Sequence, residues 1–527
     1  MPDRARFASG RHAGVLIPLF SMPSRASWGV GEIADLPRLA RWLDAAALDI
    51  VQLLPVNEMA DGQNSPYSAM SAMAIDPIYI AVGEIPEVVD VGGESSLDPE
   101  QRGGLAHARK ATLIEYRRVR ALKSRVLRAA FERFESTAEN SARASTFREF
   151  MGRESWWLDD YTIFRALHAD SGGRYWLEWE AGVRERQPEA IEAARRRLAT
   201  EIRYYAWLQW IADEQWHRAR DACGPVGIFG DFPFMVSADS ADVWSRQHEF
   251  RVDASVGVPP DAFSETGQDW GLPGYRWEAM ERGGYEWLRQ RARRCASLFD
   301  GFRVDHLVGF YRTFLRERDG ATHFEPPDER SQLALGERLL RIFAESGAAI
   351  IAEDLGTVPD FVRESLGRLQ VPGLKVMRWE REWLTQGQPF REPSSYPPAS
   401  VAMTGTHDTE TLAEWWESAP LDERAKVCVL SALRDACAAG DPFSERVRDA
   451  LLRAIFDARS GLALLPFQDI FGWRDRINTP AVVNDRNWTW RLPWPVDDLI
   501  AEPAAIERAT FLRELVRWHN RAAPTAG

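Results

Sequence analysis

Eight short apolar runs recur along the chain, and polar stretches compatible with helices follow most of them. They span residues 14–19, 49–54, 226–233, 301–306, 348–354, 372–378, 401–407 and 462–469. A short apolar run is typical of a strand that is buried on both faces of a parallel sheet. Eight parallel strands are the number that a closed (β/α)₈ barrel needs. The pattern therefore predicts an α/β fold built on a TIM barrel.

Helical periodicity is clearest in residues 31–47. Apolar side chains recur there at spacings of three and four, at Ile33, Leu36, Leu39, Ala40 and Leu43. This spacing places them on one face of a helix, which is expected to follow the first strand. The last stretch, 503–521, is expected to form a closing helix.

The spacing of the runs is uneven, which indicates where insertions lie. About 170 residues separate the second run from the third, far more than one helix and its loops need. Residues 105–150 and 188–220 are rich in helix formers, so the insertion 58–225 is expected to be a mostly helical subdomain. A second insertion, 249–285, is rich in Pro, Gly and Trp and has little periodicity, and we expect a loop subdomain over the active site.

The whole chain, residues 1–527, is thus expected to form a single catalytic barrel with large helical and loop insertions. No separate C-terminal β-domain is expected. The hydrophobic content of 45% and the charged content of 27% are those of an ordinary globular protein. The net charge of −13 argues against nucleic acid and anionic membrane surfaces as partners, because both would repel the protein. A neutral substrate would not be repelled.

The four cysteines show neither a CxxC pair nor a metal-ligand spacing. They are Cys223, Cys295, Cys428 and Cys437. So few thiols in a long chain indicate a reducing compartment, in which each cysteine acts as a small buried hydrophobe. The first apolar run, 14–20, is too short for a membrane span. We therefore expect a cytoplasmic protein.

The 22 tryptophans are an unusual excess. Aromatic rings stack on the apolar faces of sugars, but they also fill cores, and for any single tryptophan burial in the core is favoured. Several of them cluster, at 156–157, 176–179, 415–416 and 488–494. A sugar-binding cleft is one use for such clusters.

Three apolar runs end with an acid. Asp305, Glu353 and Asp408 lie within the stretches 301–306, 350–356 and 403–410, at or just past the end of the apolar part of each. In a (β/α)₈ barrel the carboxyl ends of the strands form the catalytic face, so these side chains are expected to converge. Glycosidic bond chemistry uses at least two such carboxyl groups.

Each acid also has a structural interpretation. Asp305 lies two residues after Arg303, on the same side of a strand, so the pair is equally consistent with an ionised nucleophile and with a structural ion pair. Glu353 suits a general acid in an apolar site, although its segment alone favours a solvated acid at a strand end. Asp408 suits contact with sugar hydroxyls, or else the N-cap of a helix that starts near Glu410.

Motifs for metals and organic cofactors are missing from the sequence. The nine histidines form no HExxH or HxH array, and there is no GxGxxG, Walker or GxSxG sequence. We therefore expect no metal site and no cofactor.

Short blocks spread from about residue 14 to about residue 493 match a known family in order. The blocks are 64–68 (NSPYS), 230–233 (GDFP), 239–244 (DSADVW), 258–263 (VPPDAF), 267–271 (GQDWG), 302–306 (FRVDH), 352–356 (AEDLG) and 405–409 (GTHDT). Each block is modest alone, but together they are highly specific. The chain resembles the 4-α-glucanotransferases (amylomaltases, or disproportionating enzymes) of glycoside hydrolase family 77, relatives of the α-amylases.

The resemblance implies transfer of α-1,4-glucan segments by a retaining double displacement. Asp305 maps onto the nucleophile, Glu353 onto the acid/base and Asp408 onto the residue that stabilises the transition state. The sugar-contacting positions map onto Ser65, Tyr67, Asp231, Gln268, Trp270, Arg303 and His407. Maltooligosaccharides and α-1,4-glucans are the implied donors, and glucose or other sugars the acceptors.

Two departures from the family pattern affect neither the three acids nor the reaction class. The run after the nucleophile is 306–309 (HLVG), without the arginine of many members, and 478–482 reads NTPAV in place of Asn-x-Pro-Gly-Thr. Both changes bear on the sugar subsites. Two alternatives stay open: a hydrolase, which would create reducing ends, and a glucan-binding protein without activity, in which Asp305→Asn would change nothing.

Overall fold

The computed structural model describes residues 7, 10–60, 62–136, 141–260, 267–482 and 484–521. Over these residues eight parallel strands close into a barrel in the order β1-β12-β11-β10-β9-β6-β3-β2. The strands are β1 (His12–Leu16), β2 (Ile50–Gln52), β3 (Gly227–Phe232), β6 (Gly301–Val304), β9 (Ala349–Ala352), β10 (Gly373–Val376), β11 (Ser400–Met403) and β12 (Leu462–Pro466). Each of the eight predicted runs overlaps one of them, so the TIM barrel is confirmed.

The barrel closes where the first strand meets the last. β1 pairs with β12 at His12↔Leu462 and with β2 at Gly14↔Ile50. A Cβ on Gly14 would lie 2.4 Å from the Ile50 carbonyl oxygen, so only glycine permits this close approach of the two backbones. No further sheet follows β12 within the described part of the chain.

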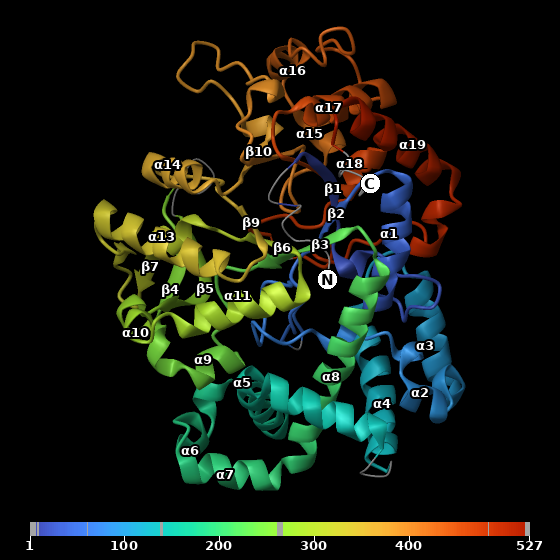
Figure 1. Ribbon diagram of the computed structural model, residues 1–527, viewed down its shortest axis with the longest axis vertical. Coiled ribbons are helices and arrows are strands. Elements are labelled where there is room, and N and C mark those ends of the chain that lie inside the picture. Colours follow the sequence, from blue (N-terminus) through green and yellow to red (C-terminus); the bar gives the residue numbers. More distant parts are fainter. Residues whose placement is uncertain are drawn as a thin grey trace.

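The first and last helices pack against each other on one side of the barrel (Figure 1). Helix α1 (Leu36–Ala45) starts five residues later than the predicted helix, because a 3₁₀ turn with a capping box at Glu32 and Asp35 precedes it. Trp42 of α1 is fully buried, and its indole N–H donates a 2.9 Å hydrogen bond to the Ala505 carbonyl of α19 (Pro503–Trp518).

Other helices follow the later barrel strands. They are α11 (Glu286–Leu298), α12 (Val308–Tyr311), α13 (Glu329–Ala344), α14 (Asp360–Leu369), α15 (Leu412–Ser418), α16 (Leu421–Cys428), α17 (Glu445–Asp457) and α18 (Phe467–Phe471). Amphipathic patterning explains their packing. In α13, for example, Leu335, Leu339 and Phe343 recur on one face and are all buried.

The segment between β2 and β3 is helical and occupies the lower part of Figure 1. Its helices are α2 (Pro86–Asp90), α3 (Pro99–Lys110), α4 (Tyr116–Glu135), α5 (Ala142–Asp170), α6 (Ala181–Arg184), α7 (Pro188–Arg197) and α8 (Ala199–Ala222). A buried ion pair of 2.6 Å between Lys123 of α4 and Glu32 ties the segment to the barrel. Residues 61 and 137–140 of this insertion lie outside the described residues.

The second insertion differs from the loop that the sequence predicts. Strands β4 (Phe250–Val258) and β5 (Gln268–Tyr275) form an antiparallel hairpin that joins β7 (Thr313–Glu317) and β8 (Thr322–Glu325) in a sheet ordered β5-β4-β7-β8. Two register shifts interrupt the β4–β5 pairing, which hides the alternation of period two. The tip of the hairpin, 261–266, lies outside the described residues. Short helices flank the hairpin, α9 (Ala241–Ser245) and α10 (Trp277–Arg282).

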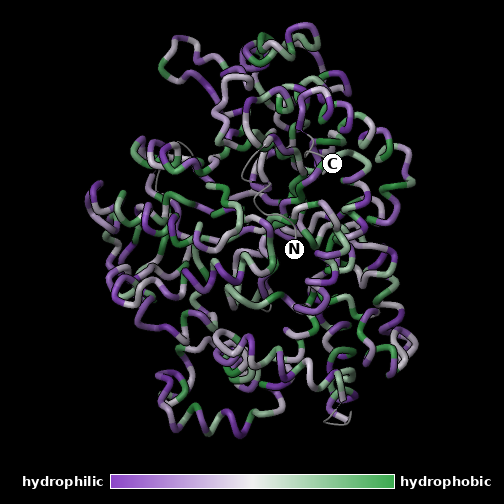
Figure 2. Tube along the Cα trace, viewed as in Figure 1, coloured by the Kyte–Doolittle hydropathy of each residue, from purple (hydrophilic) through white to green (hydrophobic). Residues whose placement is uncertain are grey.

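Most of the tryptophan excess fills the core. The fully buried ones are Trp28, Trp42, Trp176, Trp207, Trp216, Trp244, Trp287 and Trp416. Figure 2 shows hydrophobic and hydrophilic residues alternating along the outer helices, as expected for helices with one buried face. The tryptophan count therefore does not by itself locate a sugar site.

Two cysteines depart from the sequence expectation. The structure joins Cys428 to Cys437 in a disulfide with a Cα–Cα distance of 5.7 Å, whereas Cys223 and Cys295 are free and buried. The turns that follow α16 bring the pair together, and a spacing of nine residues does not reveal this. None of the helices in the described part of the chain is both long and apolar enough to cross a membrane.

Candidate active site

Arg303 lies at the centre of the site. It sits on β6, in register with Asp231 on β3 and with Ile351 on β9. Its Nη1 lies 2.6 Å from an oxygen of Asp231, and its Nη2 lies 2.9 Å from Asp305 Oδ1 and 3.8 Å from Glu353 Oε2. One buried guanidinium thus gathers three carboxyl groups from three adjacent strands.

Asp305 is the first residue after β6. Its backbone N–H donates a 3.0 Å hydrogen bond to the Phe232 carbonyl, which continues the pairing of β3 with β6. Its carboxyl accepts from the backbone N–H of Phe234 at 3.4 Å, and the side chain remains 23% exposed. The carboxylate is therefore fixed by Arg303 on one side and accessible to a ligand on the other.

Glu353 is the first residue after β9. Its Oε2 accepts a 2.6 Å hydrogen bond from the backbone N–H of His306. Burial raises the pKa of Glu353 from 4.5 to about 7, the Arg303 charge opposes this rise, and the Asp305 charge adds to it. Glu353 can therefore hold or release a proton near neutral pH, as a general acid/base must.

Asp408 lies in the loop between β11 and α15. Asn478 Nδ2 donates a 2.7 Å hydrogen bond to Asp408 Oδ1, and His407 Nε2 lies 3.3 Å from Oδ2. Burial acts to raise the pKa of Asp408, but His407 and Asn478 outweigh it and lower the pKa to about 2. The N-cap of α15 is Thr411, so the helix-cap interpretation of Asp408 was wrong.

Tyr67 connects the two halves of the site. Its hydroxyl donates a 2.8 Å hydrogen bond to Asp231 Oδ2 and lies 3.1 Å from His407 Nε2. Its ring stacks on the His407 ring, with centroids 5.5 Å apart and an interplanar angle of 17°. A continuous network thus runs from Asp408 through His407 and Tyr67 to Asp231 and Arg303.

The remaining predicted positions border this network. Trp270 of β5 packs edge-on against His306, with ring centroids 4.8 Å apart, and its indole N–H donates a 3.2 Å hydrogen bond to the side chain of Gln268. Ser65 Oγ accepts from the backbone N–H of Tyr67 at 3.4 Å, so Ser65 shapes the turn that presents Tyr67. All ten predicted side chains therefore lie in the network or next to it.

Some residues at the site were not predicted. Asn478, noted in the sequence only as part of a departure from the family pattern, is the partner of Asp408. The centroid of the Trp488 ring lies 5.6 Å from that of Tyr67 and 5.8 Å from that of His407. Trp488 belongs to one of the tryptophan clusters in the sequence, but its local sequence does not assign it to this site.

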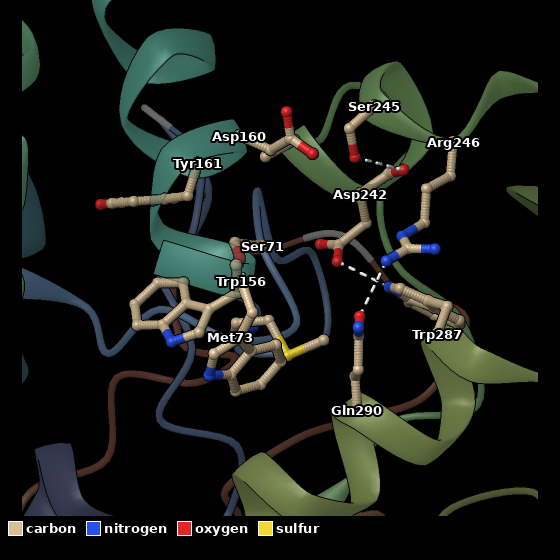
Figure 3. A pocket seen from close by; sticks show the side chains of 12 residues that line it. Ser71, Met73, Trp156, Asp160, Tyr161, Asp242, Ser245, Arg246, Trp287 and Gln290 are labelled. Atoms are coloured by element: carbon tan, nitrogen blue, oxygen red, sulfur yellow. Dashed lines mark hydrogen bonds between the residues drawn. The ribbon is translucent and has the colours of Figure 1, made fainter. Parts of the chain in front are cut away.

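A separate, small cavity lies away from this network (Figure 3). Its polar groups bind each other, since Arg246 donates to Gln290 at 2.7 Å and the Trp287 indole donates to Asp242 at 2.9 Å. Its volume of about 20 Å³ holds roughly one water molecule and no pyranose ring. No cluster of three or more His, Cys, Asp and Glu suited to a metal ion occurs among the described residues.

Comparisons with known proteins identify the family of the chain. The family model described as 4-alpha-glucanotransferase matches residues 17–497. A 4-alpha-glucanotransferase of Thermus thermophilus is 33% identical over 501 residues, which cover 92% of this chain and 95% of that protein. One of Chlamydia muridarum is 29% identical over 500 residues, covering 93% and 92%. The solved structure of amylomaltase from Streptococcus agalactiae in complex with acarbose superposes with a TM-score of 0.80 at 24% identity, covering 97% of this chain and 100% of that one.

Proposed function

The chain belongs to the 4-alpha-glucanotransferase family, whose members transfer segments of α-1,4-glucans, and we propose the residues that perform this reaction here. Asp305 is the nucleophile, Glu353 the general acid/base and Asp408 the residue that stabilises the transition state. The observation that carries the assignment is the placement of Asp305 and Glu353 on the same nitrogen of Arg303, at 2.9 and 3.8 Å.

The spacing of the two carboxyl groups is compatible with retention of configuration. The two distances to Arg303 place the bound oxygens within about 7 Å of each other, which accommodates the separation of about 5–5.5 Å that retaining enzymes use. An inverting enzyme needs a wider gap, because a water molecule must fit between the sugar and the base.

In the first step Glu353 gives its proton to the leaving glycosidic oxygen while a carboxylate oxygen of Asp305 attacks the anomeric carbon. The bond to the leaving sugar breaks, and a covalent glycosyl ester forms on Asp305. In the second step the 4-hydroxyl of an acceptor attacks the same carbon and passes its proton to Glu353. The ester bond breaks, and Asp305 is regenerated as a carboxylate.

Asp408 stays ionised throughout the cycle, because its pKa of about 2 lies far below neutral pH. A fixed negative charge stabilises the positive charge that develops on the sugar ring, and a carboxylate can also accept hydrogen bonds from ring hydroxyls. We propose both roles for Asp408. Ser65, Tyr67, Asp231, Gln268, Trp270, Arg303 and His407 are proposed to contact or frame the bound sugars.

Incubation with maltotriose alone tests the proposal. Transfer yields glucose and a ladder of longer oligomers, and the number of reducing ends stays constant. A rise in reducing ends in step with glucose release would instead identify a hydrolase. Unchanged maltotriose, with Asp305→Asn indistinguishable from the parent protein, would identify a glucan-binding protein without activity.

The proposed donors are maltooligosaccharides and longer α-1,4-glucans, and the proposed acceptors are glucose and other sugars with a free 4-hydroxyl. Acceptor competition with labelled glucose tests this assignment. Nucleic acid and anionic membranes are not expected partners, given the net charge of −13. Binding to DNA or to anionic vesicles at physiological salt would contradict that expectation.

We further propose one catalytic barrel with a helical insertion at 58–225 and a second insertion at 249–285, and a cytoplasmic location. The free thiols of Cys223 and Cys295 fit a reducing compartment, whereas a Cys428–Cys437 disulfide is typical of oxidising ones. Thiol alkylation in cells therefore tests the location and the disulfide together. Limited proteolysis tests the domain boundaries.

A further inference from the structure

An open cleft of about 650 Å³ lies on the outer side of the β4–β5 hairpin. Residues of β4, β5 and β7 form one wall, and Tyr175 and Ser237–Asp239, which follow α5 and β3, form the other. The volume is typical of sites that hold small molecules of several rings. None of the three catalytic acids lines it.

The cleft and the catalytic site share the hairpin. Successive side chains of a strand point to opposite faces. On β5, Gln268 and Trp270 belong to the catalytic side, where Trp270 contacts His306, and the alternate residues Asp269 and Gly271 line the cleft. The two spaces are thus separated by the thickness of one strand.

The groups that line the cleft suit a neutral, hydroxyl-rich ligand. The lining includes both acceptors and donors of hydrogen bonds: the carboxylates of Asp239, Asp253, Asp269 and Glu317 and the guanidinium groups of Arg316 and Arg318. An anion would meet the carboxylates, and an apolar ligand would remove these charged groups from water without replacing its hydrogen bonds. A carbohydrate satisfies both kinds of group.

Two of these side chains are available to a ligand. Within the described part of the chain the Tyr175 hydroxyl makes no hydrogen bond, and its ring, half-buried beside Trp176, offers an apolar face. The carboxylate of Asp269 is exposed and accepts only from the backbone N–H of Gly271 at 2.9 Å, among residues that are described. Asp239, in contrast, is fixed by His168 at 3.2 Å and forms a rigid part of the wall.

We propose that this cleft is a second carbohydrate site, which binds a stretch of α-1,4-glucan several residues away from the bond that reacts. The inference rests on the proposed function for the identity of the glucan. Long chains engage the catalytic site and the cleft together, and the second contact raises their effective concentration at the acids. Maltotriose is too short to reach both.

The first test is retardation of the full chain in native gels that contain amylopectin. Tyr175→Ala and Asp269→Asn remove the ring face and the free carboxylate, and both are expected to reduce retardation. Trp518→Ala and Asp422→Asn are matched controls, because Trp518 is 84% exposed on α19 and the Asp422 side chain is 76% exposed on α16, both outside the cleft. The controls should migrate like the parent protein.

The second test compares substrates of different length. Both cleft variants should raise KM for amylopectin roughly three- to tenfold, the size expected for loss of one aromatic contact, and leave kcat and KM for maltotriose unchanged. The proposal would be overturned if both variants showed the same retardation and the same KM for amylopectin as the parent protein. Equal losses on maltotriose and amylopectin would also overturn it, because the residues would then belong to the catalytic site.

Failure of the proposed function gives a different result. In that case the parent protein shows no transfer activity and is still retarded by amylopectin, with weaker retardation in Tyr175→Ala and Asp269→Asn. That result would contradict the catalytic assignment and support the carbohydrate site in the cleft. A fold defect in Tyr175→Ala is detected as a loss on maltotriose, and Asp269→Asn, at an exposed position, then decides between the outcomes.

Discussion

The backbone N–H of His306 donates a 2.6 Å hydrogen bond to Oε2 of Glu353. His306 follows Asp305 directly and adopts a left-handed backbone with φ of 42°. The turn that presents Asp305 therefore also fixes Glu353. Because Oε2 is occupied as an acceptor, the proton of neutral Glu353 belongs on Oε1.

Replacement of Glu353 by Gln should lower kcat for maltotriose by about 10²–10⁴-fold, because the leaving oxygen loses its proton donor. A maltosyl fluoride donor needs no protonation to depart, so its first step should slow far less. Single-turnover rates of fluoride release and of maltotriose cleavage measure the difference in the first step. Equal losses with the two donors, or near-parental turnover of maltotriose, would contradict the acid/base role.

The pH dependence of activity should have an alkaline limb near pH 7. Glu353, with its pKa raised to about 7, must be protonated for the first step, so kcat with maltotriose falls as pH rises through that value. Burial lowers the pKa of His306 to about 4, so this neighbour does not produce the limb. The limb should vanish for the fluoride donor in Glu353→Gln.

The same shift makes a prediction about stability. A carboxyl whose pKa rises from 4.5 to about 7 on folding favours the folded state when protonated, so its contribution is lost as pH rises between these values. Glu32, buried beside Lys123, also has a pKa of about 7 and adds the same trend. The free energy of unfolding of wild type minus that of Glu353→Gln isolates Glu353 and should decline from pH 4.5 to 7.

A covalent intermediate should accumulate in Glu353→Gln treated with maltosyl fluoride, since the first step proceeds and the second lacks its base. Intact-mass spectrometry should show one added maltosyl group, and peptide mapping should place it on Asp305. Asp305→Asn in the same background is the control and should remain unmodified. Label on another residue would reject Asp305 as the nucleophile.

Loss of the Asn478 amide should leave the Asp408 carboxylate less well positioned for catalysis. Asn478→Ala removes the 2.7 Å hydrogen bond to a charged acceptor, an interaction worth about 1.5–3 kcal/mol, so kcat/KM should fall roughly 10–100-fold. Asn478→Ser keeps a hydrogen-bond donor on a shorter side chain, so it should recover part of the lost kcat/KM. Asn484→Ala is a control outside the Asp408 contacts, since Asn484 accepts from the backbone of Arg486 and Asn487. Parental kcat/KM in Asn478→Ala would refute the role.

Asp231→Asn should destabilise the protein. The buried Arg303 guanidinium would lose its shortest ion pair, of 2.6 Å, and breaking a buried pair costs about 3–5 kcal/mol. The control Asp498→Asn removes a partner of the exposed Arg25 and should cost only about 0–1 kcal/mol. Denaturant unfolding of both variants measures the difference. Equal effects would mean that Asp305 and Glu353 alone compensate Arg303.

The sequence by itself determined the barrel and its three acids. Buried parallel strands are continuous apolar runs, so local pattern alone located all eight, and the acid after each of three runs followed from strand geometry. The common side of Arg303 and Asp305 also follows from this pattern, since the two residues are two positions apart along a strand. The resemblance added the roles and the sugar contacts.

Only the tertiary structure decided the partners of those acids. Asp408 contacts Asn478 and His407, and the N-cap of α15 is Thr411. The local sequence is equally compatible with an N-cap at Asp408, so it does not reveal either fact. Likewise, β7, distant in sequence, pairs with β4 and extends the β4–β5 hairpin into a larger sheet. The Cys428–Cys437 contact depends on how the turns after α16 pack. Periodicity records which face of an element is buried. It does not record which distant segment covers that face, because many segments bury a similar apolar area.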